Sequence, residues 1–149
     1  MKKLFSTDYS SRQADVILLL VRLIFASSMI THGLPKLKKL LGDEPVQFAN
    51  VMGMGAPTSL TLAMLSEFGC SLLVLIGLGT RLAVIPLIIT MLVVIFHIHI
   101  DDPFSKKELP LLYLTAFTGL LVMGSGRYSV DHLLNKKWAA FGSREQALK

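Results

Sequence analysis

Residues 14–34 have the sequence ADVILLLVRLIFASSMITHGL, an apolar run that is interrupted near its middle by Arg22. A second run, TSLTLAMLSEFGCSLLVLIGL at residues 58–78, carries Glu67 near its middle. Each run is long enough to cross about 30 Å of hydrocarbon at about 1.5 Å per residue. A charged side chain at bilayer depth costs about 2.5–3.5 kcal/mol, so it usually faces the interior of a bundle and marks a functional site. We therefore expect a membrane protein with a polar site inside the bilayer.

Two further apolar blocks follow, at residues 82–100 and 109–124. The last block is short, so we expect its helix to begin near residue 105, with Lys106 and Lys107 reaching toward the interface. The composition, with 52% hydrophobic and 17% charged residues in 149, fits one membrane domain. The sequence predicts an all-α fold, a single-domain four-transmembrane-helix bundle with a basic tail: spans at about 14–34, 58–78, 82–100 and 105–124, and the tail at 127–149.

The loops predict how the chain lies in the membrane. Lys and Arg number nine on the side of the two termini and five on the opposite side. The positive-inside rule therefore predicts that both termini are cytoplasmic. The polar stretch before the first span is long for a signal peptide, so we expect an uncleaved helix. Residues 35–57 are too long for a bare connector and mix apolar with polar side chains, which predicts a short amphipathic helical segment at the outer face.

Several kinds of function are disfavoured by the residue content. The net charge is +5, but the basic residues are spread over loops and termini, so we expect no nucleic-acid partner. The single cysteine, Cys70, excludes an intramolecular disulfide and a CxxC pair, and we interpret it as a packing residue. The chain carries no haem-attachment or dinucleotide-binding motif. We therefore expect no covalently attached cofactor.

Arg22 and Glu67 are predicted to meet. Counting the helical rise from the ends of their spans places the two residues within about 5 Å of the same level. We expect an ion pair between the first and second helices. It has two interpretations that stay open: a buried salt bridge that fixes the helix register, or a group that acts on a substrate or a proton.

A second group of polar side chains is expected at the outer ends of the first, third and fourth helices: His32, Lys36, His97, His99, Glu108 and Tyr113. Together they would surround a pocket suited to a quinone headgroup or a small oxyanion. Helical phase favours His97 as the histidine that faces inward. Because His97 and His99 point about 160° apart on a helix, both cannot bind one metal, and no metal site is predicted.

Short motifs also follow one another along the chain. They are Arg22, THGLPKL at 31–37, FA at 48–49, Glu67, GLGTR at 77–81, His99, Glu108 and GSGRYSVD at 124–131. This order resembles the DoxX family of small four-helix membrane proteins, over residues 22–134. The chain departs from the family pattern at Ala26 and Ser27, where glycine is common, and at Cys70, where small residues or glycine are usual.

The resemblance implies a bacterial or archaeal protein of the inner membrane linked to sulfur and redox metabolism. Some family members are subunits of a thiosulfate:quinone oxidoreductase, and others associate with sulfurtransferases and superoxide dismutase under oxidative stress. The family pattern includes His99 rather than His97, so both histidines remain candidates. It falls on these further residues: Arg22, His32, Lys36, Glu67, Arg81, Glu108, Arg127 and Asp131. Arg127 and Asp131 are expected to cap the fourth helix on the cytoplasmic side, near Arg81.

Three functions stay open. In a redox subunit that handles a quinone or a small sulfur oxyanion, the catalytic groups are expected to be Glu67, Glu108 and His32. The substrate-binding groups would be Arg22, Lys36, His97, His99, Arg81 and Tyr113. Such a subunit needs a bound cofactor or another subunit, for example a second redox subunit or a sulfurtransferase-like partner, because the chain has no electron carrier of its own. The alternatives are a transporter or channel for a small solute or proton, which requires a homo-oligomer, and a non-enzymatic scaffold for redox proteins.

Overall fold

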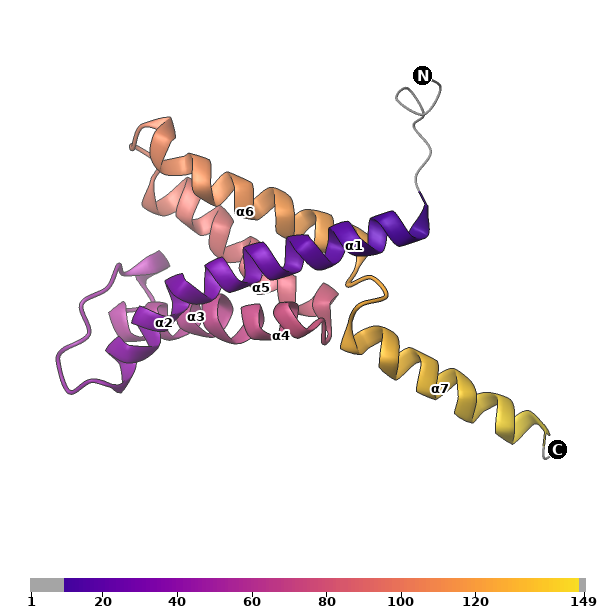
Figure 1. Cartoon of the computed structure of the whole chain (residues 1–149). Helices are drawn as coiled ribbons and strands as arrows, with labels where there is room; N and C mark the ends of the chain where they lie inside the picture. The colour runs from indigo at the N-terminus through magenta and orange to yellow at the C-terminus, as the bar shows by residue number, and fades with distance from the viewer. Residues whose placement is uncertain (1–9, 148–149) are drawn as a thin grey trace, which may run out of the picture.

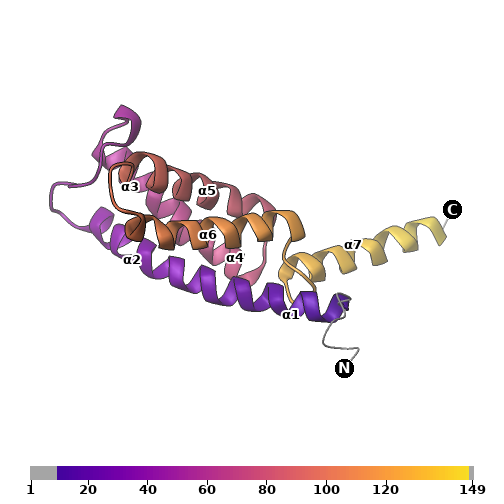
Figure 2. The same cartoon turned by 90° about the horizontal axis from the view of Figure 1, so that it is seen from above.

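The computed structural model describes residues 10–147, and the side chains as far as Trp138. Four helical rods lie side by side, and a further helix, α7 (Val130–Ala147), extends away from them (Figure 1, Figure 2). Residues 10–147 contain no strand. The rods are, in chain order, α1 (Ser11–Val21), η2 (Arg22–Ala26) and α2 (Ser27–Leu41); α3 (Ala56–Met64), η4 (Leu65–Cys70) and α4 (Ser71–Ile76); α5 (Thr80–Val93) and η5 (Val94–Ile98); and α6 (Phe104–Met123).

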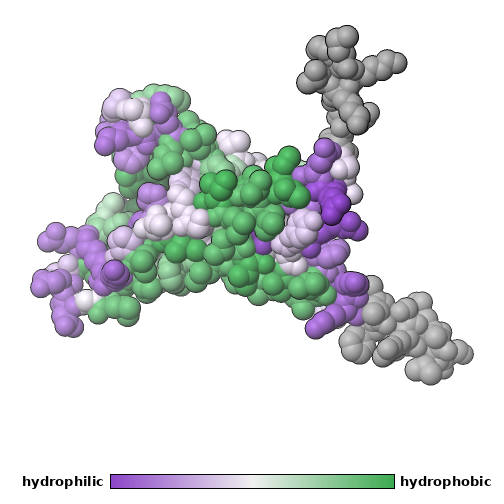
Figure 3. All heavy atoms as spheres, viewed as in Figure 1, coloured by the Kyte–Doolittle hydropathy of each residue, from purple (hydrophilic) through white to green (hydrophobic). Residues whose placement is uncertain are grey.

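Three of the rods are long and apolar enough to cross a membrane: Ser11–Leu41, Ala56–Ile76 and Thr80–Ile98. Figure 3 shows hydrophobic atoms covering the middle of the bundle and hydrophilic atoms at its two ends. The predicted all-helical membrane fold is confirmed for these three spans, and the environment of the bundle is a lipid bilayer. The fourth rod, α6, packs against α5 in the same bundle.

The two ends of the bundle differ. Both termini of the described chain lie at one end, which we call the terminal end (Figure 1). The opposite end, which we call the loop end, carries the loop at residues 42–55 and the turn at residues 99–103. The first rod is longer than predicted, because its helix continues through Pro35 to Leu41.

A separate amphipathic helix was predicted within residues 35–57, and this prediction is wrong: residues 35–41 continue the first rod, and a loop follows at residues 42–55. Residues 45–50 are not helical, and only one short 3-10 turn, η3 (Val51–Gly53), follows them. Met52, Gly53 and Gly55 have positive φ angles of 50°, 77° and 87°. Because a helix needs negative φ at every residue, this backbone cannot continue as one.

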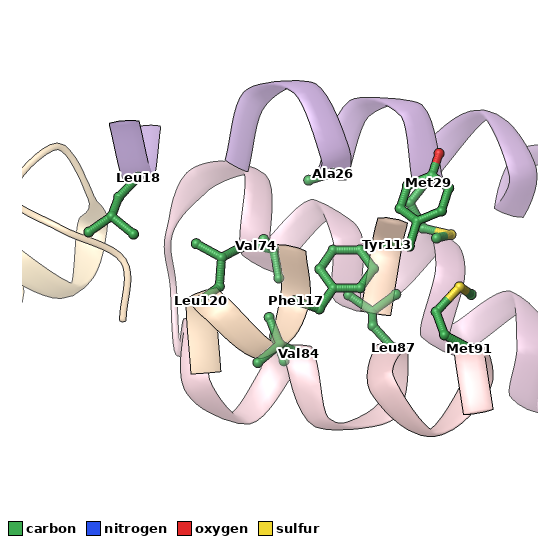
Figure 4. Close-up of a cluster of buried hydrophobic side chains, with 11 residues drawn as sticks. Leu18, Ala26, Met29, Val74, Val84, Leu87, Met91, Tyr113, Phe117 and Leu120 are labelled. Carbon is green, nitrogen blue, oxygen red and sulfur yellow. The ribbon is translucent and has the colours of Figure 1, made fainter. Parts of the chain in front are cut away.

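The core fills the space between all four rods (Figure 4). Phe117 of α6 is fully buried at its centre and stacks on Tyr113, with the ring centroids 5.8 Å apart. Figure 4 places Leu18 at the terminal end of this cluster and Met29, Met91 and Tyr113 at its other end. The predicted packing role of Cys70 agrees with its half-buried position beside the core.

Gly33 sets the register of the first two rods. A Cβ at this position would lie 2.6 Å from the backbone nitrogen of Phe68 and 2.8 Å from the carbonyl carbon of Glu67. Real Cβ atoms do not approach other atoms so closely, so only glycine allows this contact. The first rod therefore touches the second one at Glu67, far from Arg22.

Three of the rods contain a π-helical stretch, η2, η4 and η5. Each holds one of the polar residues singled out from the sequence: Arg22, Glu67 and His97. The π-helix accommodates more residues per turn than the α-helix and occurs often at functional sites. Such a stretch shifts the direction of the side chains that follow it, relative to a continuous α-helix of 3.6 residues per turn.

Candidate functional site

A cavity of about 430 Å³ opens at the loop end, between α2 and η4 on one side and η5 and α6 on the other. In Figure 3 the surface is hollowed at this end, between two hydrophilic groups of atoms. The cavity lining combines charged, aromatic and apolar side chains: Met29, His32, Lys36, Glu67, Met91, Val94, His99, Ser105, Lys106, Leu109, Pro110 and Tyr113. Four residues predicted for the outer pocket are among them: His32, Lys36, His99 and Tyr113. Glu67, which was predicted to pair with Arg22 deeper in the bundle, lines the same cavity.

The charged centre of the cavity is an ion pair between Lys36 and Glu67. The Glu67 side chain is 7% exposed and that of Lys36 is 22% exposed. Lys36 also donates a hydrogen bond of 3.2 Å to the carbonyl of His32, one helical turn before it. A carboxylate this deeply buried needs such a cationic partner. The close approach at Gly33 brings the pair together, since it places α2 directly against the backbone of η4.

One wall of the cavity is aromatic. Tyr113 is 3% exposed, and its hydroxyl shares a hydrogen bond of 2.6 Å with the Ser28 hydroxyl. The rings of His32 and Tyr113 meet edge to face, with centroids 6.0 Å apart and an interplanar angle of 90°. Phe25 approaches the same tyrosine ring edge to face, at 5.7 Å. The tyrosine ring is therefore held in a fixed orientation at the cavity wall.

The structure distinguishes the two histidines of the third rod. His99 lines the cavity, and its Nδ1 lies 2.6 Å from the carboxylate of Asp102. His97 is exposed and does not line the cavity, so the orientation predicted from helical phase is wrong. The reason is the π-helical stretch η5, which shifts the phase after Val93. The DoxX pattern, which includes His99, agrees with the geometry.

Glu108 lies outside the cavity. It is exposed on α6, whereas the cavity is lined by Lys106, Leu109, Pro110 and Tyr113 of the same helix. These four residues follow the spacing of one helical face, and Glu108 falls off that face. The prediction that Glu108 joins the pocket is therefore wrong.

Arg22 does not meet Glu67. It is 1% exposed and donates hydrogen bonds to four backbone carbonyls. The acceptors are Val74 at 2.9 Å, Leu75 at 2.9 Å, Ser125 at 2.9 Å and Tyr128 at 2.8 Å. The predicted ion pair is wrong because the contact at Gly33 sets the register: Arg22 lies eleven residues, or about 16 Å, from the level of Glu67. Arg22 instead binds carbonyls at the end of α4 and in the turn before α7, and it thereby joins the first rod to these two segments.

Arg81, Arg127 and Asp131 lie at the terminal end, away from the cavity. Arg81 Nη2 donates to the carbonyl of Val122 at 3.0 Å, near the end of α6. Asp131 accepts hydrogen bonds from the backbone N–H groups of Gly79 at 2.7 Å and Thr80 at 3.2 Å. Asp131 therefore caps the beginning of α5, where the sequence predicted a cap on the fourth helix. Arg81 is close to the end of α6, as expected, but it is not part of the predicted substrate site.

Sequence reasoning missed three residues that contribute to the contacts at the two ends of the bundle. Asp15 is 9% exposed and accepts a hydrogen bond of 2.9 Å from the backbone N–H of Arg127. Ser28 orients Tyr113, and Lys106 adds a second cation to the cavity lining. Only Asp15 gave a sequence signal that could have been used, since it is an acidic residue just inside the first apolar run.

The described residues contain no cluster of His, Cys, Asp or Glu that could hold a metal ion. The cavity offers instead a buried ion pair, a tyrosine hydroxyl, two imidazoles and the apolar side chains of Met29, Met91 and Val94. This set can hold a flat, partly polar molecule and supply or accept protons at its edge.

An apolar helical bundle with a polar cavity between its rods defines a multi-pass membrane protein. The DoxX family profile matches residues 17–100. The chain is also 31% identical, over 128 residues, to inner membrane protein YqjF of Escherichia coli (strain K12), and the alignment covers 83% of this chain and 96% of YqjF. The chain belongs to the DoxX family, as its motifs predicted. No solved structure matches it.

Proposed function

We propose that this DoxX-family protein is a redox-associated subunit of the inner membrane that binds a quinone headgroup in the loop-end cavity. The observation that carries the proposal is the Lys36–Glu67 ion pair, which is buried at the wall of a cavity together with Tyr113. An ion pair that only joins two helices does not require an adjoining cavity of about 430 Å³. This volume lies within the range of about 300–1,000 Å³ that is common for small-molecule sites.

The topology that goes with this proposal has four spans, with α6 as the fourth. Its N-terminal turns carry Lys106 and Lys107, whose long side chains can reach the interface while the rest of α6 stays in hydrocarbon. Both termini are then cytoplasmic, in line with the excess of Lys and Arg at the terminal end. The inner-membrane location is supported by the relative YqjF, which is an inner membrane protein.

The cavity groups match the parts of a quinone. The ammonium of Lys36 and the hydroxyl of Tyr113 are hydrogen-bond donors for a ring carbonyl. Met29 and Met91 provide apolar, polarizable contacts for the ring. Reduction of a quinone takes two electrons and two protons, and Glu67, His32 and His99 are groups through which protons can pass. The electrons would come from a second redox subunit, since the chain has no electron carrier.

A small sulfur oxyanion is a second candidate ligand. Two lysines, Lys36 and Lys106, line the cavity against one carboxylate, that of Glu67. Without a ligand the lining therefore carries one positive charge in excess, to which an anion is attracted. The transporter and scaffold hypotheses place no small molecule stably in this cavity, so ligand content separates them from both redox candidates.

Mass spectrometry of small molecules extracted from the protein purified in mild detergent tests the proposal. We expect quinone in stoichiometric amount in the unmodified protein. His99→Ala and Tyr113→Phe should lower the quinone content, because both residues line the cavity. The matched controls are His97→Ala and Glu108→Gln, which alter exposed groups outside the cavity at the same end.

The result decides between the hypotheses. Quinone that falls only in the cavity variants supports the proposal. Thermal stabilisation by thiosulfate that is lost in Lys36→Met, without any extracted quinone, would favour the oxyanion. Lipid alone in every sample, with no stabilisation by thiosulfate, would contradict both and favour a transporter or a scaffold.

A further inference from the structure

A second cavity, of about 750 Å³, lies at the terminal end of the bundle. It is enclosed by the beginning of α5, the end of α6 and the first turns of α7. None of its lining residues belongs to the loop-end cavity, so its role is separate from the proposed quinone site.

The charged group that stays available in this cavity is a hydrogen-bond donor, the guanidinium of Arg81. The one carboxylate of the cavity, Asp131, already accepts from Gly79, Thr80 and the Ser125 hydroxyl, at 2.7, 3.2 and 3.1 Å. Arg81 is exposed and uses Nη2 to bond the carbonyl of Val122, at 3.0 Å. Its other guanidinium N–H groups have no hydrogen-bond partner within residues 10–138. A guanidinium with unused donors is well suited to a phosphate group.

Thr80 provides a second observation. It lines the cavity and is 1% exposed, and its hydroxyl has no hydrogen-bond partner among the residues that the structure describes. A buried hydroxyl without a partner is costly, and a polar group from outside the protein chain is one way to satisfy it. Thr80 is the neighbour of Arg81 in sequence, so the two side chains offer donors within one small region.

The cavity also has an apolar border. Leu82 is 75% exposed, Met123 is 53% exposed and Trp138 is 77% exposed, and all three line the cavity. Leu82 and Met123 lie at the ends of α5 and α6, where the hydrophobic surface of the bundle meets the polar terminal end. Tryptophan is enriched at this level of membrane proteins, beside the lipid headgroups.

We propose that the terminal-end cavity binds the headgroup of an anionic phospholipid from the adjacent leaflet. Arg81 and the Thr80 hydroxyl bind the phosphate, and the acyl chains lie against Leu82 and Met123. The apolar border favours a lipid over a soluble phosphate, because a soluble phosphate ion has no use for exposed leucine and methionine side chains. Lys136, which is on α7 outside the cavity, takes no direct part.

The chain has a single tryptophan, Trp138, which makes the test direct. We would measure quenching of its fluorescence in detergent micelles by phosphatidylglycerol with brominated acyl chains, and by phosphatidylcholine brominated in the same way. Half-quenching should need about fivefold less phosphatidylglycerol, the effect expected from one arginine near a lipid of net charge −1, because the choline cation makes phosphatidylcholine neutral. Arg81→Gln should abolish this preference. Thr80→Val, which keeps the side-chain shape, should weaken quenching by both lipids, because both carry the phosphate. Lys136→Gln is the control for loss of one positive charge and should keep the preference.

Three outcomes would overturn the proposal. The first is equal quenching by the two lipids in the unmodified protein. The second is an equal loss of preference in Arg81→Gln and Lys136→Gln, which would indicate only a general effect of charge. The third is relief of the phosphatidylglycerol quenching by inorganic phosphate at millimolar concentration, which would assign the cavity to a soluble phosphate. Circular dichroism of each variant verifies that the helices are retained, and Thr80→Val keeps the test valid if Arg81→Gln unfolds.

Discussion

Replacing Arg22 by methionine should strongly destabilise the bundle. The change removes the donors for four backbone carbonyls, at Val74, Leu75, Ser125 and Tyr128. A hydrogen bond in a helical membrane protein contributes about 0.6 kcal/mol on average, and one in a protein interior about 1 kcal/mol. The four lost bonds therefore correspond to a loss of about 2–4 kcal/mol in the free energy of unfolding.

Titration with sodium dodecyl sulfate in mixed micelles, followed by far-ultraviolet circular dichroism, measures this free energy. Arg22→Lys should recover less than half of the loss, because one ammonium cannot replace a guanidinium that donates from three nitrogens in different directions. Arg12→Met is the matched control. Arg12 lies on the same rod but is exposed, so its replacement should change the free energy of unfolding by less than about 0.5 kcal/mol.

Two results would refute this reasoning. One is a loss below about 1 kcal/mol for Arg22→Met, which would mean that the four bonds contribute little. The other is a coupling energy above about 1 kcal/mol between Arg22→Met and Glu67→Gln in a double-mutant cycle. Such a coupling would indicate that Arg22 and Glu67 form a direct ion pair, instead of the contacts between Arg22 and backbone carbonyls.

Three further changes test the packing. Gly33→Ala should destabilise the bundle by about 1–3 kcal/mol, because the new Cβ would overlap the backbone of η4. Gly119→Ala should stabilise it by up to about 1 kcal/mol, because nothing lies within 4 Å of a Cβ at that position. Thermal unfolding compares the two variants. Glu67→Leu should cost about 1–3 kcal/mol because it leaves the half-buried Lys36 ammonium without its carboxylate partner, and adding Lys36→Met should recover part of that loss in the same detergent titration. If the double variant is less stable than Glu67→Leu, the ion pair does not explain the loss. Asp131→Asn should cost about 1 kcal/mol by weakening the cap of α5, and faster hydrogen exchange at the first N–H groups of that helix, with unchanged exchange in α3, would show it.

The rods of this fold could be predicted because their signal is a long uninterrupted run of apolar residues. The run at 58–78 corresponds to Ala56–Ile76, and the run at 82–100 to Thr80–Ile98. The end of the first rod was misjudged at residue 34, because Pro35 was interpreted as a terminator. A proline removes one N–H donor from a helix, but the helix here continues to Leu41.

The site was predictable only in part. His32, Lys36, His99 and Tyr113 follow from helix ends that must meet in an antiparallel bundle, whereas Glu67 was assigned to Arg22, and His97 and Glu108 were wrongly included. The partner of Glu67 depends on the relative height of two helices, which one small residue, Gly33, determines. Neither the relative height of the two helices nor the π-helical stretch before His99 can be predicted from the periodicity of one rod, because both arise from contacts between rods.

The contacts of Arg22 also constrain how the protein is made. Two of its four acceptors lie 103 and 106 residues further along the chain, at Ser125 and Tyr128. At about 5–20 residues per second, a ribosome takes about 5 to 20 seconds to make those acceptors after Arg22. Throughout this interval at least two of the four acceptors of the Arg22 guanidinium have not been synthesised. The first helix must therefore be inserted with an arginine that water, lipid phosphate or the insertion machinery stabilises until Tyr128 has been made.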